Sequence, residues 1–109
     1  MKKYIERLAW GTDAGFYRLI PQEVLHPATE QDILDIIARA HKEKKHITFR
    51  AAGTSLSGQA ISDSLLVVCG KKWEQYTVHD EGKSITLQPG IVGQRVNEIL
   101  KSYGKYFTP

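Results

Sequence analysis

The sequence predicts a single α+β domain in which a small βαβ part precedes an antiparallel sheet with a covering helix. Residues 22–69 combine short strand patterns with one amphipathic helix, and residues 70–109 contain a hairpin pattern followed by a second helix. A chain of 109 residues, 41% of them hydrophobic, is long enough for one modest core. Strands joined by a helix, followed by a hairpin with a covering helix, are typical of mixed folds.

Residues 1–21 are expected to form an arm that packs on the rest of the domain. Apolar and aromatic side chains recur in this segment, but Gly11 and Gly15 interrupt the pattern. Because glycine favours turns and loops, the arm is predicted to consist of helical turns joined by a loop.

A first strand is predicted at residues 23–26, and Pro27 ends it because proline cannot donate to a strand ladder. A helix is expected to follow, running to about residue 44. Thr29 offers a capping hydroxyl, and Asp32 places a carboxylate near the positive end of the helix. The apolar face of this helix is made of four residues spaced one to three apart: Ile33, Ile36, Ile37 and Ala40.

Two further strands are predicted, at residues 47–49 and 64–69. The second is a run of apolar residues, which is typical of a strand that is buried on both faces. Cys69 lies in this run and is the only cysteine of the chain, so it is interpreted as a small core residue. Such use of cysteine fits a reducing compartment, and a cytoplasmic location is expected.

A β-hairpin is predicted from strands at residues 76–79 and 84–88, with Gly82 supplying an unusual backbone angle in the turn. A second helix is expected after Pro89 and Gly90, with Gly104 as its left-handed C-terminal cap. The apolar face of that helix comprises Val92, Val96, Ile99, Leu100 and Tyr103.

The formal charge of +3 and the pI near 9.0 raise the question of nucleic-acid binding. The basic residues are scattered apart from a short run at 42–46, and no recognition motif with interleaved aromatic residues accompanies them. Nucleic acid is therefore not expected as a partner. No apolar stretch reaches the roughly 18 residues of a membrane span, and the four histidines lack the spacing of metal ligands.

Residues 50–59, Arg-Ala-Ala-Gly-Thr-Ser-Leu-Ser-Gly-Gln, carry the clearest chemical pattern. Two glycines allow the backbone to approach a ligand closely, successive N–H groups can bind an anion, and the hydroxyl side chains add donors. The segment lacks the ending of a P-loop and the three-glycine dinucleotide pattern. Its composition therefore permits phosphate binding but is also that of an ordinary loop.

Several other conspicuous side chains are interpreted as structural. Arg50 could reach a phosphate, but a basic residue at the end of a strand more often pairs with a nearby carboxylate or a C-terminal carbonyl, and this structural role is expected of it. Large aromatic side chains usually anchor cores and interfaces. The remaining residues interpreted in this way are Asp13, Arg18, Trp10 and Trp73.

Residues 47–59 resemble the FAD pyrophosphate loop of flavoproteins related to vanillyl-alcohol oxidase and p-cresol methylhydroxylase. Residues 11–21 and 85–90 also resemble segments of that family. The branch that the chain resembles contains FAD-linked dehydrogenases of 2-hydroxy acids such as D-lactate, glycolate and D-2-hydroxyglutarate. The residues similar to that branch are Asp13, Tyr17 and Arg18. The resemblance implies a PCMH-type FAD-binding domain.

The resemblance also implies which residues contact the cofactor. The FAD pyrophosphate is expected against the backbone of the loop, and the end of the second hairpin strand is also expected to lie near the cofactor. The residues assigned in this way are Ala52, Gly53, Thr54, Ser55, Gly58, Gln59, Pro89 and Gly90. Relatives that attach the flavin covalently through this loop have histidine at the position of Thr54, so FAD is expected to be bound non-covalently.

The implied function is hydride transfer from a 2-hydroxy acid to flavin, followed by electron transfer to an acceptor. The resemblance places the catalytic base and the substrate-binding residues in later parts of such polypeptides, so no catalytic residue is assigned. Some relatives also carry an iron–sulfur domain downstream. The chain is expected to be a truncated, inactive fragment with an arm (1–21), a βαβ part with the FAD loop (22–69) and the start of a second subdomain (70–109).

Two other functions remain open from the sequence. One is a flavin-free module that keeps the fold and binds a partner protein, and the other is a basic nucleic-acid-binding domain. Bound flavin would distinguish the first reading from both alternatives, and salt-dependent oligonucleotide binding would single out the last.

Overall fold

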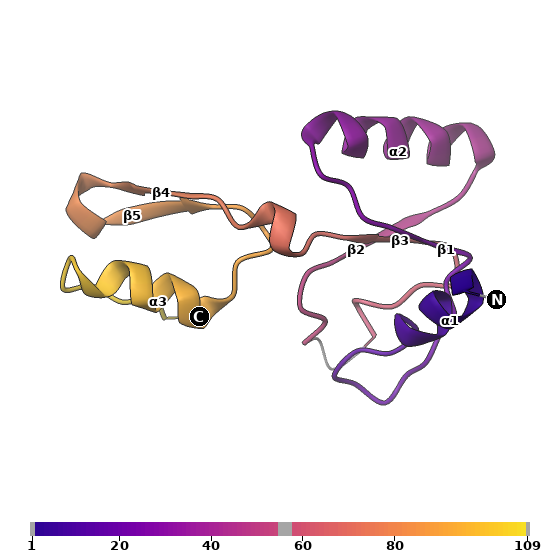
Figure 1. The fold of residues 1–109 in the computed structure, drawn as a ribbon, viewed down its shortest axis with the longest axis horizontal. Coiled ribbons are helices and arrows are strands. Elements are labelled where there is room, and N and C mark those ends of the chain that lie inside the picture. The colour runs from indigo at the N-terminus through magenta and orange to yellow at the C-terminus, as the bar shows by residue number, and fades with distance from the viewer. Residues whose placement is uncertain (1, 55–57, 109) are drawn as a thin grey trace. The chain divides into compact units, whose positions relative to one another are not determined.

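The computed structural model of the protein describes residues 2–54 and 58–108. The chain forms two compact units, Met1–Cys69 (unit 1) and Gly70–Pro109 (unit 2). Unit 1 contains a parallel sheet and unit 2 contains an antiparallel hairpin, each accompanied by helices (Figure 1). The predicted α+β class is therefore confirmed.

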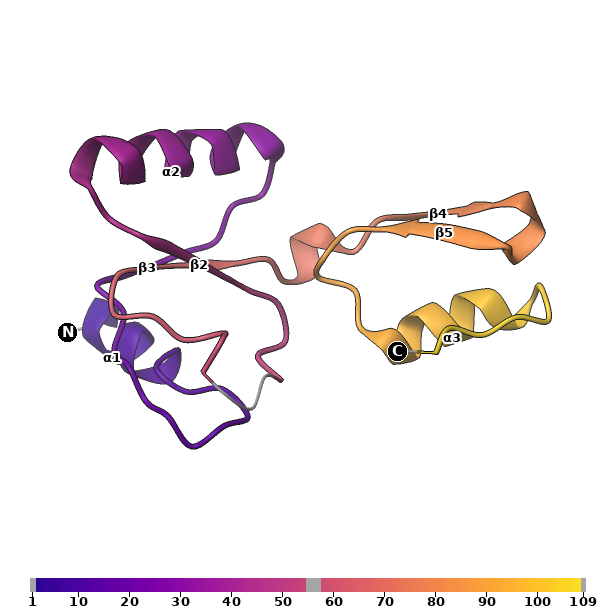
Figure 2. The same ribbon diagram turned by 180° about the vertical axis from the view of Figure 1, so that it is seen from behind.

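Unit 1 is built on three parallel strands, β1 (Glu23–Leu25), β2 (Ile47–Arg50) and β3 (Leu65–Val68). The strand order is β1-β3-β2, so the last strand in the sequence lies at the centre of the sheet. Helices α1 (Lys2–Ala9) and α2 (Glu30–Glu43) lie on opposite faces of this sheet (Figures 1 and 2).

β3 is the core of unit 1. Leu65, Leu66 and Val67 are fully buried, and Val68 is 5% exposed. A central strand that is covered on both faces has no polar face, which explains the continuous apolar run. The predicted buried strand is thus confirmed. Cys69, which follows it, is also buried, and this burial raises the pKa of its thiol.

α2 begins with the capping box that the sequence predicts. The N–H of Asp32 donates to the Thr29 hydroxyl at 3.1 Å, and the N–H of Thr29 donates to the Asp32 carboxylate at 3.2 Å. The helix ends at Lys44 with a left-handed φ of 55°, where glycine is more usual. Its apolar face is less buried than expected, since Ala40 is 3% exposed but Ile37 is 46% exposed.

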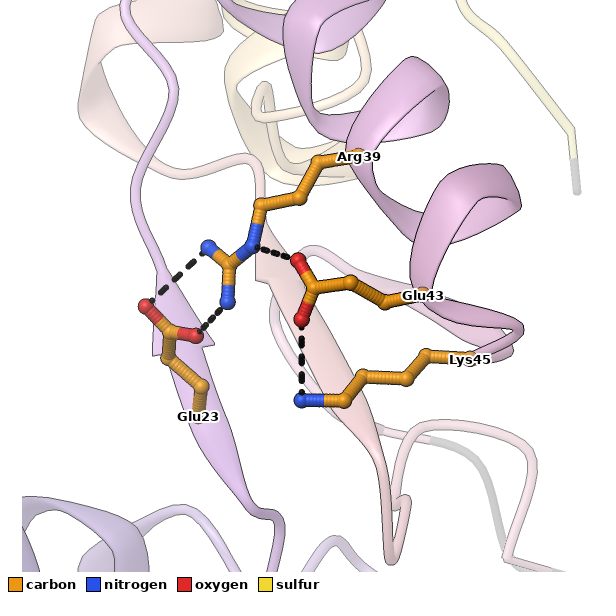
Figure 3. A network of polar contacts seen from close by, with 4 residues as sticks. All are labelled: Glu23, Arg39, Glu43 and Lys45. Carbon is orange, nitrogen blue, oxygen red and sulfur yellow. Dashed lines mark hydrogen bonds and ion pairs between the residues drawn. The ribbon is translucent and has the colours of Figure 1, made fainter.

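An ion-pair network connects α2 to β1 (Figure 3). The Arg39 guanidinium binds both carboxylate oxygens of Glu23, and its Nε donates to Glu43 at 2.8 Å. Lys45 lies 3.4 Å from the other Glu43 oxygen. The hydrogen bond from Arg39 lowers the pKa of the Glu23 carboxyl. Because the Arg39 and Glu23 side chains are 39% and 41% exposed, solvent screens the pair and its contribution to the stability of unit 1 is small.

The arm differs from its prediction after α1. Residues 10–20 form no further helical turn. Instead, Thr12 and Arg18 form an isolated antiparallel bridge, and the N–H of Leu19 donates to the carbonyl of Gly11 at 3.0 Å. The prediction of helical turns here is wrong, because backbone pairing between residues several positions apart closes the segment into a loop.

Unit 2 begins with a short 3-10 turn at Lys71–Trp73, which the sequence analysis did not predict, and continues into the predicted hairpin. The hairpin strands are β4 (Tyr76–His79) and β5 (Ser84–Leu87), paired antiparallel. Gly82 has a φ of 94°, and a Cβ there would lie 2.8 Å from the Cβ of Tyr103. Both the positive φ of the turn and the close contact with Tyr103 therefore require glycine at position 82.

α3 (Gly93–Lys101) lies alongside the hairpin (Figure 1). Its buried residues are Val96, Ile99 and Leu100. Gly104 has the expected left-handed conformation, with a φ of 69°, and the N–H of Lys105 donates to the carbonyl of Leu100 at 3.1 Å. The apolar face is shorter than predicted, because Val92 and Tyr103 lie outside the helix and are 52% and 44% exposed. No helix in the described part of the chain could cross a membrane.

Candidate functional site

The candidate site lies where the chain leaves β2. The connection from the carboxyl end of β2 to the amino end of β3 is described at residues 51–54 and 58–64, which lie along the face of the sheet that carries α1 (Figure 2). Where this segment is described, it contains no helix or strand. Ligands of α/β sheets bind outside the carboxyl ends of the strands, where such connections begin. The described residues 51–54 and 58–59 are called the cradle below.

Two glycines give the cradle its backbone shape. Gly53 and Gly58 have φ angles of 71° and 78°, a region that residues with a side chain rarely adopt. Within the described part of the chain, no hydrogen bond uses the N–H groups of Ala52, Gly53 or Thr54. Ala52 and Thr54 are exposed. These donors are therefore available to an anion such as a pyrophosphate.

The remaining residues predicted to contact the cofactor lie in different parts of the chain. Gln59 is exposed at the end of the cradle. Ser55 lies outside the described residues. Pro89 and Gly90 belong to unit 2, so their contact with the same cofactor stays a prediction.

Arg50, the last residue of β2, lies directly against the cradle. Its Nη1 donates to the carbonyl of Thr12 at 2.6 Å and to that of Ala60 at 3.5 Å, which is the main-chain pairing expected from the sequence. Its guanidinium carbon lies 4.9 Å from the centre of the Trp10 ring. Burial lowers the pKa of Arg50 and the charge of Asp13 raises it, but an arginine remains protonated at neutral pH.

The arm covers the cradle, which the sequence analysis did not anticipate. The N–H of Ala14 donates to the carbonyl of Gly53 at 2.9 Å. A Cβ on Gly58 would lie 3.5 Å from the Tyr17 ring. Asp13 accepts a hydrogen bond from the N–H of Gly15 at 2.8 Å, which tightens the turn that presents Ala14. The one feature of the sequence that could have indicated this packing was the resemblance of residues 11–21 to a family segment.

Gly90 has a structural role inside unit 2. Its N–H donates to the carbonyl of Trp73 at 2.8 Å. A Cβ there would lie 2.7 Å from that same oxygen and closer still to the carbonyl oxygen of Gly70. Trp73 is 7% exposed, as expected for a core residue. The turn after β5 is thus held directly against the main chain of residues 70–73.

Replacing Gly90 with alanine is expected to destabilise unit 2. The added methyl group would overlap two backbone carbonyls that cannot move independently, and overpacking of this kind costs about 1–3 kcal/mol. Amide hydrogen exchange in residues 70–109 should accelerate. Gly93→Ala is the control, because a Cβ there meets nothing within 4 Å. Equal amide exchange rates in the two variants would contradict the prediction, because the turn would then accommodate the methyl group without loss of stability.

Comparison with known proteins identifies the family. Residues 21–109 match the FAD binding domain family. The chain belongs to this family. The residues present fit such a cofactor, because the cradle offers available N–H donors and two left-handed glycines beside a cation. The match includes the cradle and unit 2 but not residues 1–20, which comprise α1 and all of the arm except Pro21.

The relatives of this chain include a dehydrogenase and an oxidase subunit. D-2-hydroxyglutarate dehydrogenase of Haemophilus influenzae is 31% identical over 97% of this chain, which spans 11% of that protein. Glycolate oxidase subunit GlcD of Escherichia coli is 26% identical over 85% of this chain, which spans 19% of that protein. The chain therefore corresponds to a small part of each relative.

A solved structure supports the FAD-binding fold. GilR, an oxidoreductase that catalyses the terminal step of gilvocarcin biosynthesis, superimposes with a TM-score of 0.61 over 89% of this chain and 20% of its own length. The sequence identity is 19%, so this likeness concerns the fold alone. It confirms the truncated PCMH-type fold that the sequence resemblance implies.

Proposed function

We propose that the cradle binds the pyrophosphate of FAD in an oxidoreductase that acts on a 2-hydroxy acid. The carrying observation is the pair of left-handed glycines, Gly53 and Gly58, around N–H groups that have no acceptor in the described part of the chain. The proposed cofactor contacts are Ala52, Gly53, Thr54, Ser55, Gly58, Gln59, Pro89 and Gly90. The 2-hydroxy acid follows from the names of the relatives, which act on D-2-hydroxyglutarate and glycolate.

In this proposal the chain binds and orients the cofactor. The flavin, when bound, supplies the hydride acceptor. The N–H groups of the cradle hold the two phosphates, and the exposed Thr54 hydroxyl is a further donor. No residue of this chain is assigned to proton abstraction or to substrate binding.

The test uses the complete natural polypeptide that carries these residues, called the natural polypeptide below. Purified under native conditions, it should contain FAD, identified by absorbance and mass. Dye reduction should follow addition of D-2-hydroxyglutarate, glycolate or D-lactate. Flavin without turnover of any 2-hydroxy acid would overturn the substrate class alone. A colourless protein that takes up no FAD would overturn the proposed function and favour a flavin-free partner-binding module.

The FAD is proposed to be bound non-covalently through this loop. Thr54 has a hydroxyl group where a covalent linkage would need a ring nitrogen. Acid precipitation of the natural polypeptide should therefore leave essentially all of the yellow flavin in the supernatant. Flavin that stays in the pellet would contradict the prediction, and peptide mapping would then locate the bond.

Three finer features also stay predictions. A cytoplasmic location is supported by the single, buried and unpaired Cys69. An electron acceptor and an iron–sulfur cluster are expected only for other parts of the natural polypeptide. Metal analysis and acid-labile sulfide assays of that polypeptide would test for the cluster.

A further inference from the structure

A single guanidinium group joins the arm to the cradle. Arg50 donates to the carbonyl of Thr12, which is 38 residues away in the sequence, and to the carbonyl of Ala60 beyond the cradle. Its planar group also lies 4.9 Å from the centre of the Trp10 ring. The same group therefore contacts both the arm and the residue that follows the cradle.

The guanidinium group also fixes how closely Gly53 approaches β2. A Cβ on Gly53 would lie 2.6 Å from both Cζ and Nε of Arg50, so the cradle backbone packs directly on the side chain. Ala14 of the arm also donates to the carbonyl of Gly53. Gly53 therefore contacts both the cation and the arm, and its own N–H is not used in these contacts.

The contacts favour arginine over any other cation at this position. Its Nη1 donates to two carbonyls while its guanidinium carbon lies over the Trp10 ring, 4.9 Å from the ring centre. Lysine has a compact ammonium that cannot combine this geometry with stacking. The buried Nε has no hydrogen-bond partner within the described residues. The group is therefore held by shape and stacking as well as by hydrogen bonds.

We infer that Arg50 is a positioning residue for the cofactor loop, which clamps the arm against Gly53 and so holds the N–H groups of the cradle in place for a pyrophosphate. This inference rests on the proposed function. In this role Arg50 acts through the backbone of the loop, and Trp10 supports it by stacking.

The experiment measures the Kd of FAD for the apo form of the natural polypeptide in Arg50→Met, Arg50→Lys, Trp10→Leu and the Arg50→Met/Trp10→Leu double variant. Both Arg50 variants should raise the Kd at least about tenfold, which corresponds to about 1.4 kcal/mol. Trp10→Leu should raise it as well, and the double variant should match Arg50→Met, because the two side chains act as one unit. Arg95→Met, an exposed arginine on α3, is the matched control and should leave the Kd unchanged.

Two further readouts separate positioning from folding. At saturating FAD, kcat and KM of each variant should equal those of the wild type, and the unfolding midpoint of the apo form should show that each variant is folded. Wild-type affinity in Arg50→Lys together with a loss in Arg50→Met would overturn the inference, because charge alone would then suffice. The inference would also be overturned if the increase in Kd in the double variant equalled the product of the increases in the two single variants.

Failure of the proposed function gives a different result. If the wild-type polypeptide binds no FAD, the proposed function is wrong, and the clamp is tested by amide hydrogen exchange of the protein as isolated. Arg50→Met should then accelerate exchange in residues 12–18 and 51–54, whereas Arg95→Met should not. Unchanged exchange in Arg50→Met would overturn the inference by itself.

Discussion

Replacing Gly53 with valine in the natural polypeptide is expected to abolish FAD retention. The φ of 71° at this position is unfavourable for any residue with a side chain, by about 1–2 kcal/mol even before β-branching is considered. In addition, the new Cβ would occupy the space of the Arg50 guanidinium group, 2.6 Å from its Cζ. Either the Arg50 side chain is displaced or the backbone leaves its left-handed conformation, and both changes disturb the N–H groups that are proposed to hold the phosphates.

The measurement is the ratio of flavin to protein after purification, followed by titration of the apo form with FAD. Gly93→Val is the control, since an added Cβ at the start of α3 meets no atom within 4 Å. Gly58→Ala should have an intermediate effect, because its φ is 78° but its Cβ would meet Tyr17 only at ordinary contact distance. A folded Gly53→Val variant with full flavin content would show that the cradle does not bind the cofactor.

The 109 residues alone are expected to bind FAD weakly and to have no activity. The cradle offers contacts for the pyrophosphate only, and tight ligand sites bury about 70% or more of the ligand surface. The chain spans 11% of its dehydrogenase relative, whose other parts are not represented here. An isoalloxazine ring left in water would lose most of the available binding energy.

Calorimetric titration of this chain with FAD should give a Kd well above about 1 μM, a value that corresponds to about 8.2 kcal/mol. The natural polypeptide in the same buffer provides the comparison. Dye reduction with D-lactate, glycolate and D-2-hydroxyglutarate should show no turnover by the chain. Submicromolar affinity or measurable turnover would show that these residues form a more complete site than we propose.

Local features of the fold followed from short stretches of sequence. The capping box of Thr29 and Asp32 and the turn at Gly82 involve residues only a few positions apart, so their residue types are sufficient to predict them. The burial of residues 65–68 was predicted because an unbroken apolar run has no face suited to water. Lys44 was not predicted as a left-handed helix end because its side chain gives no such signal.

The cradle was found by composition and resemblance, but its environment was not. Glycine and hydroxyl residues indicate a loop that an anion can approach, and they do so without any knowledge of the fold. The contacts of Arg50 with Thr12 and Trp10 join residues about 40 positions apart, and nothing in the local sequence encodes their approach. The arm was likewise predicted to pack on the domain, but the residues that it contacts were not predicted.

The sequence by itself therefore determined the α+β class, the order and approximate bounds of the strands and main helices, and the segment most suited to a pyrophosphate. The tertiary structure alone decided that β3 lies between β1 and β2, that residues 10–20 close into a loop, and that this loop covers Gly53. The reason is physical: hydrophobic periodicity and capping act within a few residues, whereas strand order and the partners of Arg50 depend on which distant surfaces pack together when the whole of unit 1 buries β3.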